Sequence, residues 1–150
     1  MFNRIAPNAA ATLLRSALGI IFLSHAYLKL AVFGVAATGQ WFAAHGFPAW
    51  TAGPVAFAEL LGGAALLLGV YTRAVVIGLV PVMLGALATH APNGWFFSNP
   101  EGGYEYPVFL MAALGVQLLL GDGAYAVSTR FTRPRSDRAW AQVGDGSPAR

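Results

Sequence analysis

The order of apolar and polar residues along the chain predicts four membrane-crossing helices. The first apolar run, residues 13–33, is about twenty residues of mainly Leu, Ile, Val, Phe and Ala. At about 1.5 Å per residue it is long enough to cross a hydrocarbon core of about 30 Å. Three further apolar runs occupy residues 52–70, 74–91 and 106–120. We therefore predict an all-α membrane protein built as a four-helix transmembrane bundle.

Two long connections and one short connection join the four runs. Residues 39–50 and 91–107 are rich in Gly, Pro and aromatic residues, a composition typical of loops at a membrane interface. The connection at residues 71–73 is very short, so the second and third helices should be antiparallel neighbours. The small-xxx-small spacing of Ala58 and Gly62 predicts that the second helix approaches another helix backbone closely.

The positions of the arginines predict the orientation of the bundle. Arg4 and Arg15 lie near the start of the first helix, Arg73 lies in the second connection, and five Arg follow the fourth helix. The first and third connections contain no Lys or Arg. Because cytoplasmic flanks carry the excess of Lys and Arg, we expect both termini in the cytoplasm and both aromatic loops on the outer side.

Composition supports a membrane protein and argues against other classes. The chain is 57% hydrophobic and only 10% charged, far from the soluble average. A net charge of +3 could suggest nucleic acid, but four of the nine basic residues lie in one segment after the last apolar run, so no nucleic-acid partner is expected. The absence of cysteine excludes disulfides and thiolate sites in this chain. A redox role would need another group or a bound cofactor.

The chain divides into two parts on this pattern. Residues 1–125 contain the four predicted helices, which form one transmembrane domain with the lipid bilayer as its partner. Residues 126–150 are polar and Arg-rich, which favours a cytoplasmic tail with little fixed structure.

Ionisable residues inside the first apolar run predict a polar interior. A lipid-exposed ionisable group at depth costs roughly 2.5–3.5 kcal/mol or more. Arg15, Phe22 and Lys29 are seven residues apart, and His25 lies four before Lys29, so all four fall on one stripe of an α-helix. This stripe should face other helices and not lipid.

Counting from the outer ends of the helices places several polar groups in one half of the bundle. Lys29 and Glu59 lie at matching depth and are natural partners, with a His25–Glu59 pair as the alternative. His90 and Glu105 come from the outer ends of the third and fourth helices. Lys29, Glu59 and Glu105 together carry one negative charge, so protonation of His25 or His90 would neutralise a cavity that all of them shared.

Each of these residues also has a purely structural explanation. The Lys29–Glu59 pair could only fix the register of two helices. Glu105 in a first helical turn and His90 in a last turn are both favoured by the helix dipole. His25 could be a histidine whose hydrogen bonds are satisfied in the core.

Several short motifs resemble one known family when taken in order. They are FAELLGG at residues 57–63, LLLGVYTR at 66–73, HAPNGWF at 90–96 and GGYEYP at 102–107, together with Arg15, His25 and Lys29 in the first helix. Together they resemble the DoxX family over about residues 11–125. The resemblance implies a small four-helix protein of the bacterial plasma membrane.

The resemblance also raises the expectation of a redox role. Some members of the family are subunits or associates of quinol-oxidising or thiosulfate-oxidising systems, and others are tied to oxidative stress and thiol homeostasis. The residues at the polar motif positions of the family are His25, Lys29, Glu59, His90, Asn93 and Glu105. The family offers no established catalytic role for them.

The first functional hypothesis is a component of a membrane oxidoreductase that binds a quinone or a similar aromatic molecule. Lys29 or His25 could donate to a quinone carbonyl while Glu59 accepts a proton. The ring could lie against side chains of the third connection, for which the candidates are Asn93, Trp95, Phe96 and Tyr104. Electrons would come from a redox protein partner, because the chain has no dinucleotide fingerprint, haem-attachment motif or thiol. No cofactor can be assigned from the chain alone, and quinone is the candidate.

Two other functions fit the same sequence. A non-catalytic membrane anchor or assembly subunit would use the polar cluster for helix packing and the Arg-rich tail for anionic lipid or a cytoplasmic enzyme. A small-solute or proton pathway would also place Lys, Glu and His within the membrane. Four short helices without a visible inverted repeat make the pathway the weaker of the two.

Overall fold

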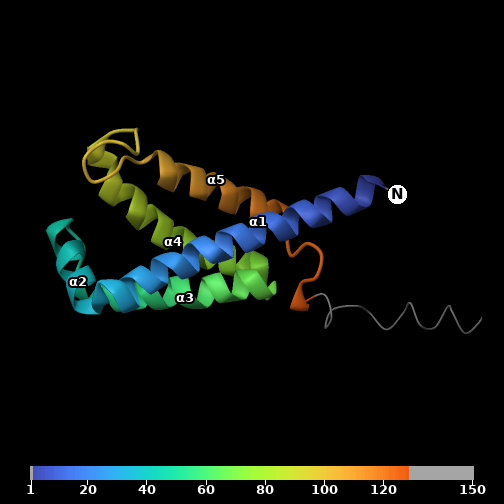
Figure 1. Ribbon diagram of the computed structural model, residues 1–150, viewed down its shortest axis with the longest axis horizontal. Helices are drawn as coiled ribbons and strands as arrows, with labels where there is room; N and C mark the ends of the chain where they lie inside the picture. The colour runs from blue at the N-terminus through green and yellow to red at the C-terminus, as the bar shows by residue number, and fades with distance from the viewer. Residues whose placement is uncertain (1, 129–150) are drawn as a thin grey trace, which may run out of the picture.

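The computed structural model describes residues 2–128, with only the backbone described at residues 2–6 (Figure 1). Over this range the chain is helical and contains no strand. The elements are α1 (Phe2–Tyr27), the π-helical segment η1 (Leu28–Val32), α2 (Gly34–Ala44), the 3-10 turn η2 (Ala49–Thr51), α3 (Ala52–Leu68), α4 (Thr72–His90), the 3-10 turn η3 (Ala91–Asn93) and α5 (Glu105–Leu120). The predicted all-α class is therefore confirmed.

Three of the described helical segments are long and apolar enough to cross a membrane. They span Pro7–Val32, Ala49–Leu68 and Thr72–Asn93. The fourth predicted span corresponds to α5, which is apolar but has only 16 residues. At 1.5 Å per residue α5 is about 24 Å long, somewhat less than a typical hydrocarbon core.

The four long helices form two pairs that diverge. α1 packs most extensively against α3, α4 packs against α5, and contacts of α3 with α4 and of α1 with α5 join the pairs. The pairs separate toward the end that carries α2 and the α4–α5 connection (Figure 1). We call this end, formed by α2 and residues 91–104, the cavity end, and the opposite end, which holds Arg15, Arg73 and Asp122, the arginine end.

The second and third predicted helices are antiparallel neighbours, as the short connection indicated. α3 ends at Leu68 and α4 begins at Thr72, and the two helices pack against each other. Between the four helices lies one apolar core. Its buried members are Leu18, Phe22, Leu66, Val76, Leu79, Met83, Leu110, Ala113 and Leu114.

A close approach of two helix backbones lies one residue beyond the predicted small-residue motif. A β-carbon placed on Gly63 of α3 would lie 2.9 Å from the Gly19 carbonyl oxygen of α1, and one placed on Gly19 would lie 2.9 Å from the Gly63 oxygen. Gly62 instead faces the Leu79 side chain of α4. Gly63 therefore allows the close contact with α1, and Gly62 allows the contact with α4. The small-xxx-small spacing alone did not predict which glycine faces which helix.

The prediction of a loop at residues 39–50 is wrong for residues 39–44, which are helical. Residues 39–44 belong to α2, and only the short segment between Ala44 and Ala49 is irregular. Gly39 reads as a loop residue in the sequence, but a β-carbon there would lie 2.8 Å from the Ala49 oxygen. Gly39 is thus required by the close packing of η2 on α2 and does not interrupt the helix.

Arg15 lies in the interior, as its stripe predicted, but at the arginine end. Its side chain is 2% exposed. The guanidinium donates to the carbonyl oxygens of Leu66 at 2.6 Å and Leu67 at 2.9 Å, and more weakly to that of Ala124 at 3.5 Å. Two of these carbonyls lie in the last turn of α3, where the Leu66 oxygen also accepts from the Gly69 backbone N–H at 3.2 Å. Arg15 therefore caps α3 and is far along α1 from His25 and Lys29.

Asp122 closes the arginine end after α5. Its carboxylate accepts from the Thr72 backbone N–H at 3.1 Å and from the Ser128 hydroxyl at 2.6 Å. Partial burial would raise the pKa of Asp122, but the hydrogen bonds from Ser128 and Thr72, with the nearby charge of Arg15, outweigh it and hold this pKa below its ordinary value. Asp122 thus supplies an N-terminal cap to α4 and holds the chain that follows α5.

The first residues of the predicted tail are placed against the bundle. Ala126 is fully buried, and the Ser128 backbone N–H donates to the Gly69 oxygen at 3.2 Å. The rest of the predicted tail, including the arginines from Arg130 onward, lies outside the described residues.

Candidate polar cavity

The predicted ion pair between Lys29 and Glu59 forms. The Lys29 Nζ lies 2.8 Å from Oε1 and 2.7 Å from Oε2 of Glu59, so the ammonium donates to both carboxylate oxygens. The Glu59 side chain is 6% exposed and that of Lys29 is 17% exposed. The pair joins η1 to the middle of α3. Burial with two short hydrogen bonds is the arrangement in which such a pair offsets most of its desolvation cost.

A local change of helix type lies at Lys29. The Phe33 N–H bonds to the Leu28 oxygen at 2.9 Å, five residues back, and the turn between them is π-helical. A π-turn inserts one extra residue into the helical register and is common at functional sites. Straight helical spacing did not predict this turn.

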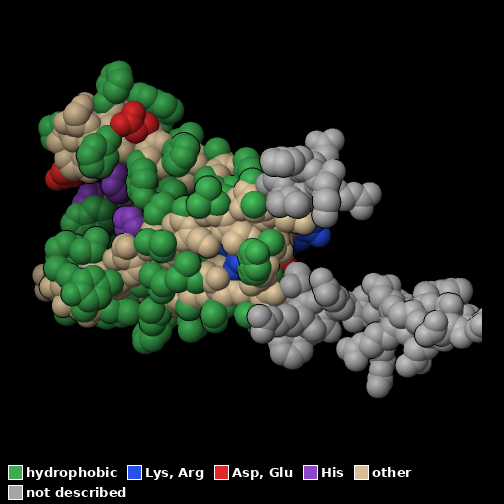
Figure 2. All heavy atoms as spheres, turned by 45° about the vertical axis from the view of Figure 1, so that its right-hand side comes forward, with side chains coloured by type: hydrophobic (Ala, Val, Ile, Leu, Met, Phe, Trp, Pro, Cys, Tyr) green, Lys and Arg blue, Asp and Glu red, His purple; other side chains and the backbone are tan. Residues whose placement is uncertain are grey.

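A large cavity opens beside the ion pair at the cavity end. Its volume is about 1150 Å³, and its wall is mostly apolar. Figure 2 shows histidine side chains in the hollow between the α2 side and the side of the α4–α5 connection. The polar side chains on the wall are Thr38, Thr51, Thr89, His25, His90, Lys29, Glu59 and Glu101. Lys29 and Glu59 neutralise each other, so the interior favours a ligand without net charge.

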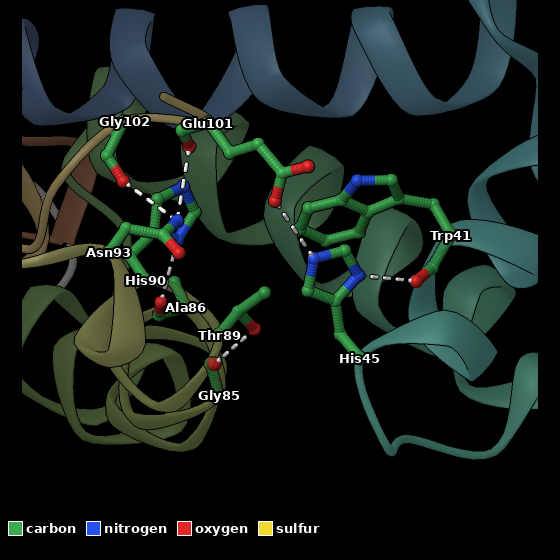
Figure 3. Close-up of polar contacts among 9 residues, drawn as sticks. All are labelled: Trp41, His45, Gly85, Ala86, Thr89, His90, Asn93, Glu101 and Gly102. Atoms are coloured by element: carbon green, nitrogen blue, oxygen red, sulfur yellow. Dashed lines mark hydrogen bonds and ion pairs between the residues drawn. The ribbon is translucent and has the colours of Figure 1, made fainter. Parts of the chain in front are cut away.

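His25 and His90 line the same cavity from opposite helix pairs. The His90 Nδ1 donates to the Ala86 oxygen at 2.9 Å, as shown in Figure 3. A carbonyl can only accept, so Nδ1 carries a hydrogen and Nε2 remains as an acceptor in the neutral ring. The His25 ring lies 6.4 Å from the Tyr106 ring of α5, centroid to centroid. Both rings therefore present polar atoms to an otherwise apolar space.

Glu105 and Asn93 lie outside this wall and hold the α4–α5 connection in shape. The Glu105 carboxylate accepts from the Phe97 N–H at 2.7 Å. The Asn93 amide donates to the oxygens of Gly102 at 3.0 Å and Glu101 at 3.5 Å (Figure 3). Neither side chain is among the described residues that line the cavity. The shared charge of Lys29, Glu59 and Glu105 that the sequence suggested is thus not assembled in this space.

The aromatic candidates from the third connection are also placed apart from the cavity. Trp95 and Tyr104 pack edge to face, with ring centroids 5.2 Å apart, and Phe96 is exposed. None of the three lines the cavity within the described part of the chain. The aromatic side chains that do line it are Phe22, Phe33, Trp41, Phe42, Phe47, Phe97 and Tyr106.

Sequence reasoning missed the part of the site that α2 supplies. Trp41 lines the cavity, with its ring 4.0 Å from that of His45 and 6.4 Å from that of His90. His45 Nε2 lies 3.7 Å from a Glu101 carboxylate oxygen (Figure 3). A signal was present in the sequence, because Trp41 and His45 are four residues apart and share a helix face. The signal was lost when residues 39–50 were interpreted as a loop.

The pair has free capacity for a ligand. An ammonium has three N–H donors, of which Lys29 directs two at Glu59. The third can donate to a ligand oxygen, and each Glu59 oxygen keeps a further lone pair to accept. For the His25 ring the described residues provide no hydrogen-bond partner. The arrangement can thus hold a neutral molecule with oxygen atoms and exchange a proton with it.

Comparison with known proteins shows the family of the chain. The model of the DoxX family matches residues 10–92. The chain belongs to the DoxX family. The match contains Arg15, His25, Lys29, Glu59 and His90, and it ends before α5, so the GGYEYP motif lies outside it.

A DoxX relative carries an oxidoreductase name. The chain is 35% identical over 92 residues to "Putative oxidoreductase CatD" of Bacillus subtilis (strain 168), covering 61% of this chain and 67% of that protein. No solved structure matches the chain significantly. The DoxX membership and the apolar helices show a multi-pass membrane protein in contact with the lipid bilayer.

Proposed function

We propose that this DoxX protein is a component of a membrane oxidoreductase system and binds a quinone-like molecule in the polar cavity. The observation that carries the proposal is the Lys29–Glu59 pair, held at 2.7 Å and 2.8 Å in the wall of an apolar space of about 1150 Å³. A quinone is uncharged, has a planar ring and carries oxygens at both ends. It therefore suits a mostly apolar cavity in which the buried charges, Lys29 and Glu59, neutralise each other and the Glu101 carboxylate is mostly exposed.

Different side chains of the cavity wall would contact different parts of such a ligand. The third N–H of Lys29 would donate to one ligand carbonyl. The other two would stay bound to Glu59 and hold the ammonium in position. His90 and His25 would contact the other polar end, and the Trp41 ring would lie against the ligand ring. Two-electron reduction of the ligand by an external partner consumes two protons. A protonated His25 would hand over one of them and solvent in the cavity the other, whereas the Glu59 carboxylate would accept a proton in the reverse reaction.

Tryptophan fluorescence tests the binding. Purified protein in detergent is titrated with a short-chain quinone, with emission read from Trp41 at the cavity. We expect saturable quenching in the wild type and in Trp50→Phe, and a loss of most of it in Trp41→Phe. Glu105→Gln, which changes a carboxylate outside the wall, is the matched charge control and should bind like the wild type. Absence of saturable quenching would contradict the proposal and leave the anchor hypothesis.

We further propose that α5 is a fourth span, so that both termini lie in the cytoplasm of a bacterium and the cavity end faces outward. The apolar sequence of α5, its packing on α4 and α1, and the position of Arg73 at the arginine end support this. The chain has no native cysteine, so single-cysteine labelling is clean. Ser98→Cys should react with an impermeant maleimide on intact spheroplasts, and Tyr125→Cys only after permeabilisation.

A further inference from the structure

α2 lies over the cavity between two glycines with left-handed backbone. Gly34 has φ of +79° and Gly46 has φ of +84°, a conformation that costs other residues free energy but not glycine. Neither is needed for space, because an added β-carbon would meet nothing within 4 Å. The side chains of Ala37, Thr38, Trp41 and Phe42 make this helix part of the cavity wall. α2 is therefore a wall segment set between two glycines whose left-handed backbone other residues rarely adopt.

One ionisable contact joins the end of α2 to the α4–α5 connection. His45 Nε2 lies 3.7 Å from a Glu101 oxygen, and the side chain of Glu101 extends from its loop toward the His45 ring (Figure 3). The other ring nitrogen, Nδ1, lies 2.8 Å from the Trp41 oxygen. Since a carbonyl oxygen only accepts, Nδ1 must carry a hydrogen. In the neutral ring Nε2 then has a lone pair toward the carboxylate, and the contact is repulsive. In the protonated ring the two groups carry opposite charges, and the contact at 3.7 Å is an ion pair.

The groups that surround His45 are an aromatic ring and, among the described residues, a single nearby carboxylate. The Trp41 ring lies 4.0 Å from it, close enough for a cation–π contact. The other charged groups on the elements that pack against α2 are Lys29 of η1 and Glu59 of α3, which are bound to each other. His90 of α4 lies across Trp41, at 6.4 Å, and its Nδ1 is bound to Ala86. Glu101 is thus the carboxylate that His45 meets.

We propose that His45 and Glu101 form a proton-operated latch that holds α2 closed over the cavity. Gain of a proton by His45 joins α2 to the α4–α5 connection, and loss of that proton releases α2 to turn about Gly34 and Gly46. Histidine is the side chain whose charge changes between about pH 5 and pH 8. Access to the cavity from this end is therefore greater at high pH. The latch rests on the proposed function only in that a ligand would use this entrance.

Distances between spin labels test the latch without any ligand. Ala44 and Ser98 are exposed on its two sides, and the double variant Ala44→Cys/Ser98→Cys has no competing thiol. At about pH 5 we expect a short, narrow distance distribution, and at about pH 8 a longer, broader one. His45→Gln and Glu101→Gln should give the long distribution at both pH values. His45→Lys, charged throughout, should give the short one at both.

The control is His90→Gln, which removes the neighbouring histidine and should keep the full pH response. A wild-type distribution that is the same at both pH values would overturn the latch, as would a pH response that persists in His45→Gln. Quinone quenching is a separate measurement. If quenching fails while the pH response holds, the proposed ligand is wrong and the latch stands; if quenching holds while the distances do not move, the latch is wrong and the ligand site stands.

Discussion

Removal of Lys29 should destabilise the bundle far more than removal of the whole pair. In Lys29→Met the Glu59 carboxylate keeps its buried position, 6% exposed, and loses both of its short hydrogen bonds. Removing one partner of a buried pair costs about 3–5 kcal/mol, whereas replacing both partners by apolar residues of similar size is often neutral or stabilising. At about 1.4 kcal/mol per factor of ten, the single variant should shift the unfolding equilibrium by at least about a hundredfold.

The assay is reversible unfolding in mixed micelles with increasing denaturing detergent, followed by circular dichroism. We compare Lys29→Met, Glu59→Leu, the double variant Lys29→Met/Glu59→Leu and the control Leu30→Met. The double variant should recover most of the loss, and the control should stay within about 1 kcal/mol of the wild type. A cost below about 1 kcal/mol for Lys29→Met, or a double variant as unstable as the single ones, would refute the claim that the pair is buried and coupled.

Three other changes test the remaining supports of the structure. Arg15→Met removes the guanidinium donor from the Leu66 and Leu67 carbonyls, of which Leu66 keeps the Gly69 N–H, and should cost about 1–3 kcal/mol in the same unfolding assay; Arg15→Lys should recover only part of this. Gly63→Ala should cost about 1–3 kcal/mol, because its β-carbon would meet the Gly19 oxygen at 2.9 Å; an unchanged midpoint would contradict the close approach. The lowered pKa of Asp122 means that its stabilisation is present at neutral pH and is lost as the pH falls below about 4. The stability advantage of the wild type over Asp122→Asn should therefore shrink on acidification, and an advantage that grows would reverse the sign of this argument.

The parts of the site that could be predicted are those in which a charged residue lies within an apolar segment. Lys29 and Glu59 are charged residues within apolar runs, and Glu59 is the single charge of its run. Because an unpaired charge at that depth is costly, a pair between them at equal depth was the simplest solution. The same reasoning placed Arg15 inside, although it could not tell that its partners are backbone oxygens at the end of α3.

The missed parts depend on packing between segments that the sequence does not place. Gly39 looks like a helix breaker unless the approach of Ala49 is known, so α2 and its cavity face were lost together. Likewise, the aromatic residues of the third connection could face either inward or outward. Trp95 and Tyr104 pack on each other, whereas Phe97, which was not singled out, lines the cavity. Such choices are decided by contacts far apart in sequence, and a pattern of residue types does not contain them.

The content of the cavity after gentle purification is the most direct test of the central claim, that the Lys29–Glu59 pair supports a site for a neutral aromatic ligand. Wild-type protein and the double variant Lys29→Met/Glu59→Leu are purified from the same membranes, and the small molecules bound to each are extracted and measured by mass spectrometry. We predict a quinone-type molecule in near-stoichiometric amount with the wild type and its loss from a folded double variant. Equal amounts in both, or none in the wild type, would contradict the account.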